Sequence, residues 1–310
     1  MSAGPLEVWR GTANAWECDH LGHMNTRFYL ARVEEGLATL AATLGVPPAR
    51  DRGSASAIEV QGQHMRFLRE VKAGAAIHMV GTVLRWGDDD ADLLFLLKHA
   101  AGESAASFRL QVQHRIGGAP APWPAGAGRI AASFAGELPA DAAPRSIDLD
   151  RDESPPSLAA ADRLGLARTG LGVILPDACD VQGRWRLSAF MGRVADSVGH
   201  LGDGGAWRET LARTAVPQPA RIGGALVEFR VRHWRWPGVG DRCELRSGLA
   251  GCTDRVTYAM HWLLDPATGS PWAAVRAVGV ALDLDARRMI RLTPEAQADY
   301  RRASAAALIV

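Results

Sequence analysis

A short polar run near the start of the chain gathers side chains that could do chemistry. Within nine residues it holds Asp19, His23 and Asn25, together with Glu17 and His20. The run stands directly before a helix-like segment, so a carboxylate and a histidine lie beside the free N–H groups of a helix start. Such a helix start favours negative charge and can hold an anion or a developing oxyanion.

The segment that follows the polar run predicts an amphipathic helix. Its apolar residues recur at steps of three and four, which places them on one helical face; they are Tyr29, Val33, Leu37, Leu40 and Leu44. Asn25 or Thr26 is suited to cap the first amides, and Gly45 predicts the end of the helix. We expect Glu34 and Glu35 on this helix to be structural or solvated.

The rest of the first half predicts an antiparallel sheet around this helix. One strand is expected at 5–16, and four more, joined by hairpin-like turns, at 57–67, 76–86, 92–99 and 107–116. This order favours an α+β fold in which one helix is wrapped by one sheet. The Gly-, Pro- and Ala-rich residues 117–172 break the pattern and predict a linker with short helices near 130–134 and 158–166.

The second half repeats the first weakly. Cys-Asp-x-x-Gly at 18–22 returns at 179–183, and the same offset of 161 residues aligns Asp19 with Asp180. It also matches the helix core in phase, setting Phe190, Val194, Val198 and Leu201 on the positions of Tyr29, Val33, Leu37 and Leu40. After the helix, residues 225–241 read like 57–74, and further strands are expected at 243–250, 255–264 and 273–284, with a closing helix from Thr293. The shared element order predicts an internal duplication.

Composition excludes several classes of function. A formal net charge of +1 offers no bulk attraction to nucleic acid or an anionic membrane. No apolar run approaches the length of a membrane span, and no signal peptide is recognised. The four cysteines have no CxxC spacing and read as reduced thiols of a cytoplasmic protein. Cys18, His20 and His23 lack a second pair to complete tetrahedral ligation, so we expect no metal site.

The spacing Asp19-x-x-Gly22-His23-Met24-Asn25-x-x-x-Tyr29 resembles the signature of hotdog-fold acyl-CoA thioesterases of the 4-hydroxybenzoyl-CoA thioesterase type. The likeness covers about residues 5–116. It implies two tandem hotdog repeats, a double hotdog in which each long central helix is wrapped by an antiparallel sheet. We place the first repeat at 1–118, the linker at 119–168 and the second repeat with its closing helix at 169–310. The chain would then be a pseudo-dimer, and pairing of two such chains as a homodimer stays open.

The resemblance also implies roles for the motif residues and needs no cofactor. Asp19 would act on an acyl-CoA thioester as nucleophile or as general base for water. The backbone N–H groups near Asn25 and Thr26 would polarise the thioester oxygen. His23 and Asn25 would position the loop, the water or the carboxylate. Tyr29 would line the acyl pocket or pack in the core.

The CoA nucleotide is expected on a rim of basic side chains. His64, Arg66 and Arg69 are candidates in the first repeat. The second repeat has Arg184 where His23 stands and Arg186 where Asn25 stands, so either arginine could contact CoA phosphates. With that part of the motif lost, we expect one complete site per chain.

Other interpretations remain at this stage. Asp19 could serve only as a turn residue and Asn25 only as an N-cap. A hotdog hydratase or dehydratase would place Asp and His five apart with an intervening proline, whereas Asp19 and His23 are four apart. A non-catalytic acyl-CoA or acyl-carrier binder is kept open by the degraded second motif. No GxSxG elbow supports a serine hydrolase, and no GxGxxG after a strand supports a nicotinamide fold.

Overall fold

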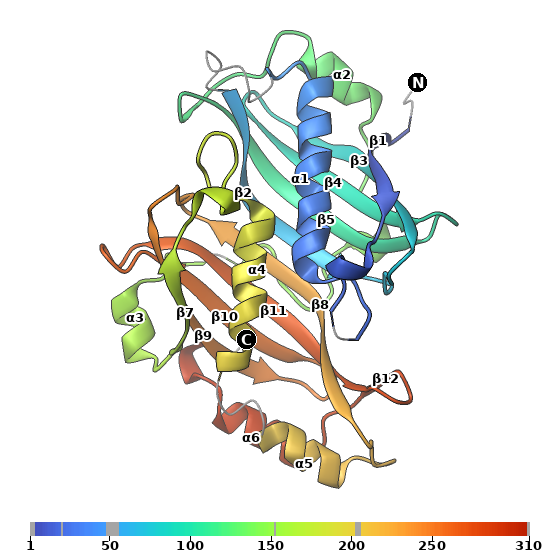
Figure 1. The fold of residues 1–310 in the computed structure, drawn as a ribbon, viewed down its shortest axis with the longest axis vertical. Coiled ribbons are helices and arrows are strands. Elements are labelled where there is room, and N and C mark those ends of the chain that lie inside the picture. Colours follow the sequence, from blue (N-terminus) through green and yellow to red (C-terminus); the bar gives the residue numbers. More distant parts are fainter. Residues whose placement is uncertain (1–3, 20, 48–55, 152, 202–205, 309–310) are drawn as a thin grey trace. The chain divides into compact units, whose positions relative to one another are not determined.

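The structure is a computed structural model of the 310-residue chain, and it describes residues 4–19, 21–47, 56–151, 153–201 and 206–308 (Figure 1). The chain forms two compact units. The first comprises Met1–Pro144 and Leu175–Ala195, and the second comprises Arg145–Ile174 and Asp196–Val310. The first unit therefore includes the start of α4 (Leu187–Ser197).

In the first unit, one antiparallel sheet has the strand order β1-β3-β4-β5-β2. Its strands are β1 (Leu6–Thr12), β2 (Ser56–Phe67), β3 (Ala76–Trp86), β4 (Asp90–His99) and β5 (Ser104–Ile116), with the short β6 (Ala119–Pro120) paired to β5. The central helix α1 (Thr26–Thr43) lies against this sheet (Figure 1). Strand and helix positions match the expectations from alternation and helical spacing, except that the first strand ends at Thr12 and the last residues of its expected range, 5–16, enter a 3-10 turn.

The apolar face of α1 is buried as predicted, since all five of its spaced apolar residues are at most 8% exposed. Gly36 lets the helix approach the sheet closely. A Cβ atom there would lie 3.1 Å from Val8 and 3.2 Å from the ring of Phe95, which is fully buried. Helix end and cap also agree with prediction, because Asn25 is the N-cap and Gly45 has a φ of 76°.

In the second unit, the sheet has the order β8-β11-β10-β9-β7. Read from its other end, β7-β9-β10-β11-β8, this is the first sheet's order with each strand replaced by its counterpart in the second repeat. The strands are β7 (Ala167–Val173), β8 (Ile222–His233), β9 (Arg242–Cys252), β10 (Thr257–Leu264) and β11 (Pro271–Asp283), with β12 (Arg288–Ile290) beside β11. The identical topology confirms the predicted α+β class and the tandem duplication.

The helix of the second repeat is shorter than its counterpart. α4 stops at Ser197 and continues as a 3-10 turn over Val198–His200. The phase prediction holds for Phe190 and Val194, which are buried, and is wrong for Val198, which is 49% exposed. Glycine at 199 and 202, within one turn of each other, weakens helix continuation because glycine has a high conformational entropy to lose.

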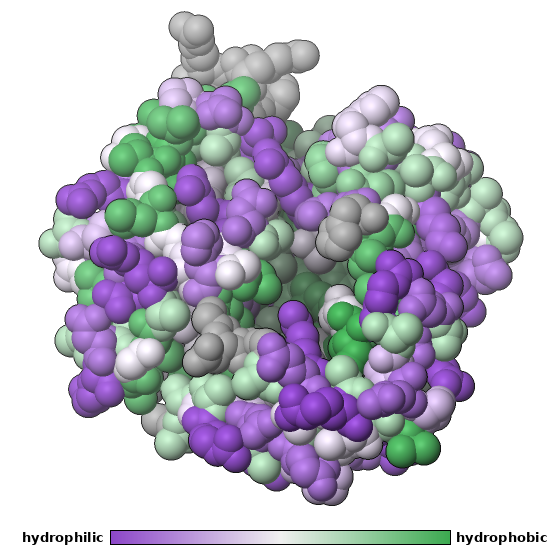
Figure 2. Space-filling view, turned by 60° about the horizontal axis from the view of Figure 1, so that its bottom comes forward, coloured by the Kyte–Doolittle hydropathy of each residue, from purple (hydrophilic) through white to green (hydrophobic). Residues whose placement is uncertain are grey.

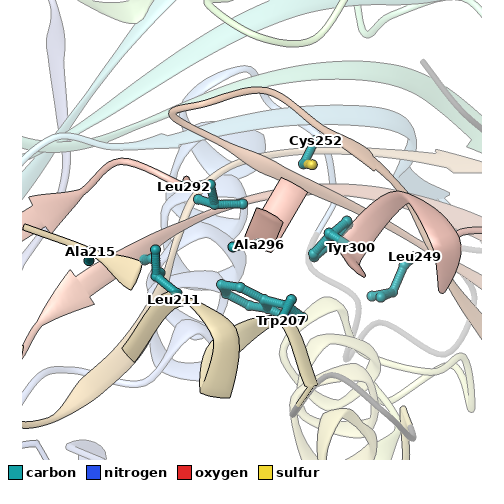
Figure 3. Packing of buried hydrophobic residues seen from close by; sticks show 9 residues of the cluster. Trp207, Leu211, Ala215, Leu249, Cys252, Leu292, Ala296 and Tyr300 are labelled. Carbon is teal, nitrogen blue, oxygen red and sulfur yellow. The ribbon is translucent and has the colours of Figure 1, made fainter. Parts of the chain in front are cut away.

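Two further helices pack against each other in the second unit. α5 (Ala206–Thr214) lies against the predicted closing helix α6 (Pro294–Arg302). Figure 3 shows their shared apolar cluster. Its buried members are Trp207, Leu211, Ala215, Leu249, Cys252, Ala281, Leu292, Ala296 and Tyr300. The second unit thus has an apolar cluster built from elements that follow α4.

The predicted linker region carries short elements of its own. They are α2 (Ala127–Ser133), a 3-10 turn at Ala140–Ala142 and α3 (Leu158–Arg163). In the first unit, the Arg66 guanidinium on β2 donates to the carbonyls of Asp141 and Ala143 at 2.6 and 2.8 Å. The start of the connecting segment is therefore held against the sheet.

The later part of the connecting segment is held in the same way within the second unit. Arg230 on β8 donates to the carbonyls of Asp148 and Arg151 at 3.3 and 3.0 Å. Arg276 on β11 pairs with Glu153 at 3.1 Å, and both side chains are nearly buried. Arginine side chains thus fasten this stretch to each sheet, while the domain boundaries proposed from the sequence stay a prediction.

On the face shown in Figure 2, hydrophilic and hydrophobic residues are intermixed. Among the described residues, no helix is both long enough and apolar enough to cross a membrane.

Candidate functional site

The polar run predicted to do chemistry folds into a tight loop between β1 and α1. A 3-10 turn at Ala15–Glu17 leads into it. The N–H of Asp19 donates to the carbonyl of His23 at 2.8 Å, and the N–H of Gly22 donates back to the carbonyl of Asp19 at 2.9 Å. Gly22 has a φ of 79°, a left-handed conformation that a residue without Cβ adopts without strain. The spacing of the motif therefore closes a turn.

The Asp19 carboxylate is fixed by this turn and exposed at its surface. Its Oδ1 atom accepts from the N–H groups of Leu21 and His23 at 2.9 and 3.1 Å. Within the described part of the chain, no donor contacts Oδ2. Hydrogen bonds to Oδ1 thus set the orientation of the carboxylate, and Oδ2 is available to a substrate or a water molecule.

Three further candidate residues lie at the same loop and helix start. The His23 Nε2 atom is 3.2 Å from the Glu70 carboxylate. Asn25 caps α1, because its Oδ1 accepts from the N–H of Arg27 at 3.0 Å. Thr26 is the first residue of the helix. The structure thus brings together Asp19, His23, Asn25 and Thr26 as predicted, while their roles in catalysis stay a prediction.

The helix start retains one free donor. The N–H of Arg27 is taken by the Asn25 side chain, and the N–H of Phe28 donates to the Asn25 carbonyl at 2.9 Å. Among the described residues, the N–H of Thr26 has no acceptor. The first amide of α1 is therefore the group that could receive a developing oxyanion.

Tyr29 is part of the core of the first unit. It is 4% exposed, and its ring meets Phe67 edge-on with 5.0 Å between centroids and lies 6.5 Å from Phe108. Burial raises the pKa of its hydroxyl. Tyr29 is expected either to line the acyl pocket or to pack in the core, and the structure shows it packed in the core.

The residues predicted to form the CoA rim either bind other groups of this protein or are buried. His64 is 3% exposed on β2. Arg66 is bound to the carbonyls of the connecting segment. Arg184 pairs with Asp180 at 3.1 Å and with Glu59 at 3.6 Å. A role of these residues in CoA binding stays a prediction that these contacts do not favour.

The second copy of the loop has the same backbone but a different carboxylate environment. Oδ1 of Asp180 accepts from the N–H groups of Gln182 and Arg184, both at 2.9 Å, as in the first copy. Oδ2 accepts from Nε and Nη2 of Arg184 at 3.2 and 3.1 Å. Both oxygens of Asp180 are therefore occupied by this chain's own donors.

An amide at the start of α4 is likewise bound by a side chain of the first unit. The Glu34 carboxylate on α1 accepts from the N–H and hydroxyl of Ser188 at 3.2 and 2.7 Å. Arg186, at the position of the capping Asn25, has no side-chain acceptor, so Glu34 supplies the cap from another helix. Burial raises the pKa of Glu34, and the bonds from Ser188 and the charge of Arg186 partly oppose this rise. The expected structural role of Glu34 is thereby specified.

Sequence reasoning did not assign a role to two residues behind the loop, Glu17 and Arg32, which form a buried ion pair. Pairing across 15 residues has no periodic signature, so only coordinates show it.

No group of three or more His, Cys, Asp or Glu side chains in the described ranges is placed to hold a metal ion. Cys18 lies in the loop and contacts the carbonyl of Asn14 at 3.4 Å, and burial raises the pKa of its thiol. His20 lies outside the described residues.

Comparison with known proteins gives the context of this loop. Residues 13–130 match the model of the thioesterase-like superfamily, which confirms the resemblance stated from the motif. No curated protein matches the sequence.

Solved structures resemble the chain over most of its length. A putative oleoyl thioesterase from Lactobacillus plantarum is similar with a TM-score of 0.62 and 11% identity, covering 90% of this chain and 97% of that one. An acyl-ACP thioesterase from Bacteroides thetaiotaomicron gives 0.59, 11%, 87% and 96% in the same order. The 12:0-ACP thioesterase from Umbellularia californica gives 0.58, 12%, 87% and 92%. At these identities the likeness concerns the fold, which is that of two tandem hotdog repeats.

Proposed function

With residues 13–130 assigned to the thioesterase-like superfamily and the chain folded as two hotdog repeats, we propose that this protein hydrolyses acyl thioesters at the loop that carries Asp19. Water and the thioester give a free acid and a thiol. The observation that supports this proposal best is the contrast between two copies of one loop. Asp19 has an oxygen free of protein donors among the described residues, whereas both oxygens of Asp180 are bound.

The proposed chemistry begins at Oδ2 of Asp19. Either this oxygen attacks the carbonyl carbon and forms an acyl anhydride that water then cleaves, or it takes a proton from the water that attacks. In both routes the carbonyl oxygen gains negative charge and the thiolate leaves. The N–H of Thr26, at the positive end of α1, would stabilise that charge.

His23 and Asn25 act in this proposal by holding the geometry. The backbone N–H of His23 orients the Asp19 carboxylate, and its ring faces Glu70. Asn25 occupies the second helical amide with its side chain, which leaves the first amide for the substrate.

The thiol carrier is proposed to be CoA, as the motif resemblance implies. A second candidate is acyl carrier protein, because two of the structures that resemble the whole chain are described as acyl-ACP thioesterases. A panel of short, long and aromatic acyl groups, each presented on CoA and on acyl carrier protein, separates the two by turnover with free-thiol detection.

Replacing Asp19 tests the function. Asp19→Asn keeps the size and the hydrogen-bond acceptor at Oδ1 but removes the charge, and we expect kcat to fall by roughly 10²–10⁴-fold, the size of a lost acid–base or nucleophilic group. Asp180→Asn is the matched control, and we expect it to leave kcat within about threefold, as for a residue outside the chemistry. Circular dichroism and thermal unfolding check that both variants fold.

Four outcomes would contradict the proposal. Unchanged turnover in Asp19→Asn would remove this carboxylate from the reaction, and equal losses in both variants would refute one site per chain. Hydration of enoyl-CoA without free-thiol release would identify a hydratase. Binding of acyl-CoA with no turnover on any substrate would identify a non-catalytic binder.

A further inference from the structure

Glu17 is a charged residue buried at the base of the catalytic loop. Its side chain is 4% exposed. One carboxylate oxygen accepts from the N–H of Asn14 at 2.9 Å, and the other pairs with the Arg32 guanidinium. A buried carboxylate without such partners would be strongly destabilising. Glu17 is therefore fixed by contacts on both of its oxygens.

Arg32 connects Glu17 to the helix and to the first strand. It projects from α1 about two turns after the helix start and is mostly buried, with a side-chain exposure of 14%. Its guanidinium donates to Glu35 at 2.7 Å and lies 4.8 Å from the centroid of the Trp9 ring. Trp9 itself donates to Glu35 at 2.8 Å. Contacts with Glu17, Glu35 and Trp9 thus hold the Arg32 side chain in place.

The loop is closed at Glu17 by its backbone as well. The N–H of Asn25 donates to the carbonyl of Glu17 at 2.8 Å, so the two ends of the segment 18–24 meet at this residue. That segment carries Asp19 and His23. Any rotation of Glu17 relative to α1 would therefore move the whole loop relative to the helix start.

The second copy of the loop shows what the ion pair adds. There the N–H of Arg186 donates to the carbonyl of Ala178 at 3.0 Å, so the loop closes without a carboxylate. Ala178 stands where Glu17 stands, and Arg193 where Arg32 stands. The turn therefore forms without the ion pair, and the pair is found in the copy with the complete motif.

We propose that Glu17 and Arg32 are positioning residues, which hold the loop of Asp19 in fixed orientation to the first amide of α1. The inference deepens the proposed function and rests on it. The carboxylate and the oxyanion donor must approach one carbonyl group from different directions, and an error of about 1 Å in such geometry costs about 10²-fold in rate. The ion pair joins the two elements that carry these groups.

The test compares Glu17→Gln, Arg32→Met and the double variant. We expect each to lower kcat by about 10²-fold, with KM within about threefold, because the reacting geometry and not the binding surface is altered. The double variant is expected to be no worse than the poorer single variant, since both break one contact. Arg32→Lys keeps the charge and is expected to recover at least about tenfold of the loss in kcat.

Arg193→Met is the matched control, because it removes the equivalent arginine of the second copy, and its kcat should not change. Hydrogen exchange supplies a readout independent of activity. We expect faster exchange of the amides in 18–25 in Glu17→Gln and Arg32→Met, and unchanged exchange in Arg193→Met. Folded variants that retain wild-type kcat and wild-type exchange in this loop would overturn the proposal.

The two proposals fail in different ways. If wild-type protein releases no thiol from any acyl thioester, the proposed function is refuted, while faster loop exchange in both variants would still support the tie between the ion pair and the loop. If Asp19→Asn loses activity but Glu17→Gln and Arg32→Met do not, the function stands and the positioning role is refuted.

Discussion

Two carboxylates in equivalent turns differ in what remains available to a substrate. Backbone amides fix Oδ1 in both Asp19 and Asp180, so the turn alone orients each carboxylate. Arg184 then occupies Oδ2 of Asp180. The arginine that stands in the second copy where the first has His23 therefore makes Asp180 one half of an ion pair.

Glu34 gives a prediction about pH at the same scale. Burial raises the pKa of its carboxyl from a usual value of 4.5, so the folded protein binds this proton more tightly than the unfolded chain does. The contribution to stability is therefore present at low pH and is lost as pH rises through the raised pKa. Glu34→Gln keeps an acceptor for Ser188 without the charge, and we expect it to unfold at urea concentrations at least equal to wild type at pH 7.5.

The measurement is urea unfolding of wild type and Glu34→Gln between pH 5 and 7.5. The difference between the two should shrink toward the acidic end. Glu137→Gln, at an exposed carboxylate, serves as control and should follow the wild-type curve. Parallel curves for wild type and Glu34→Gln would contradict a pKa of Glu34 that burial raises.

At the scale of elements, helix starts serve two purposes in this fold. Asn25 caps α1 at the candidate site, and Thr293 caps α6 in the second unit, where its Oγ1 accepts from the N–H of Ala296 at 3.3 Å. Both caps use a side-chain oxygen that accepts from an amide of the first helical turn. Of these two helices, α1 alone carries a free first amide, because α6 begins with Pro294, which has no N–H.

Replacing the caps separates stability from function. We expect Asn25→Ala and Thr293→Ala each to reduce the free energy of unfolding by about 1 kcal/mol, the usual cost of a lost N-cap. Only Asn25→Ala should also lower kcat, because it frees the second amide and loosens the helix start. Denaturant unfolding and thioester turnover, measured on both variants, check this. Equal effects on kcat would show that Asn25 acts through stability alone.

Element order and helix faces could be predicted from the sequence because they depend on periodicity. The strands of both sheets, the buried face of α1 and the cap at Asn25 follow from local pattern, and the repeat follows from one offset. The end of α4 at Ser197 could not, since the apolar phase continued past it to Val198 and Leu201. The ion pair of Glu17 with Arg32 and the cap of α4 by Glu34 join distant positions, for which one sequence holds no periodic signal.

At the scale of the whole molecule, the two units of the duplicated chain share one topology but differ in how their apolar residues are packed. The first unit buries a long helix on its sheet, with its close approach at Gly36. The second carries the α5–α6 cluster, in which Trp207 meets Tyr300 edge-on at 5.5 Å.

Trp207 tests this division. Trp207→Ala removes a large side chain that is 5% exposed, and we expect a loss of about 3–5 kcal/mol in the free energy of unfolding. Hydrogen exchange should report the loss in the second unit, with kcat retained under conditions where the protein is folded. Leu171→Ala, at a residue that is 54% exposed, is the control and should cost less than about 0.5 kcal/mol. Exchange that rises equally in both units would contradict this assignment.

The arginines that bind the connecting segment have a consequence for how its sequence can change. Arg66 and Arg230 bind main-chain oxygens, which every amino acid supplies. Substitutions in the segment therefore leave these anchors intact as long as its path and length are kept. The connecting segment has the composition of a flexible linker. Its sequence can nevertheless change widely without altering its path, because arginines on β2 and β8 bind its main chain.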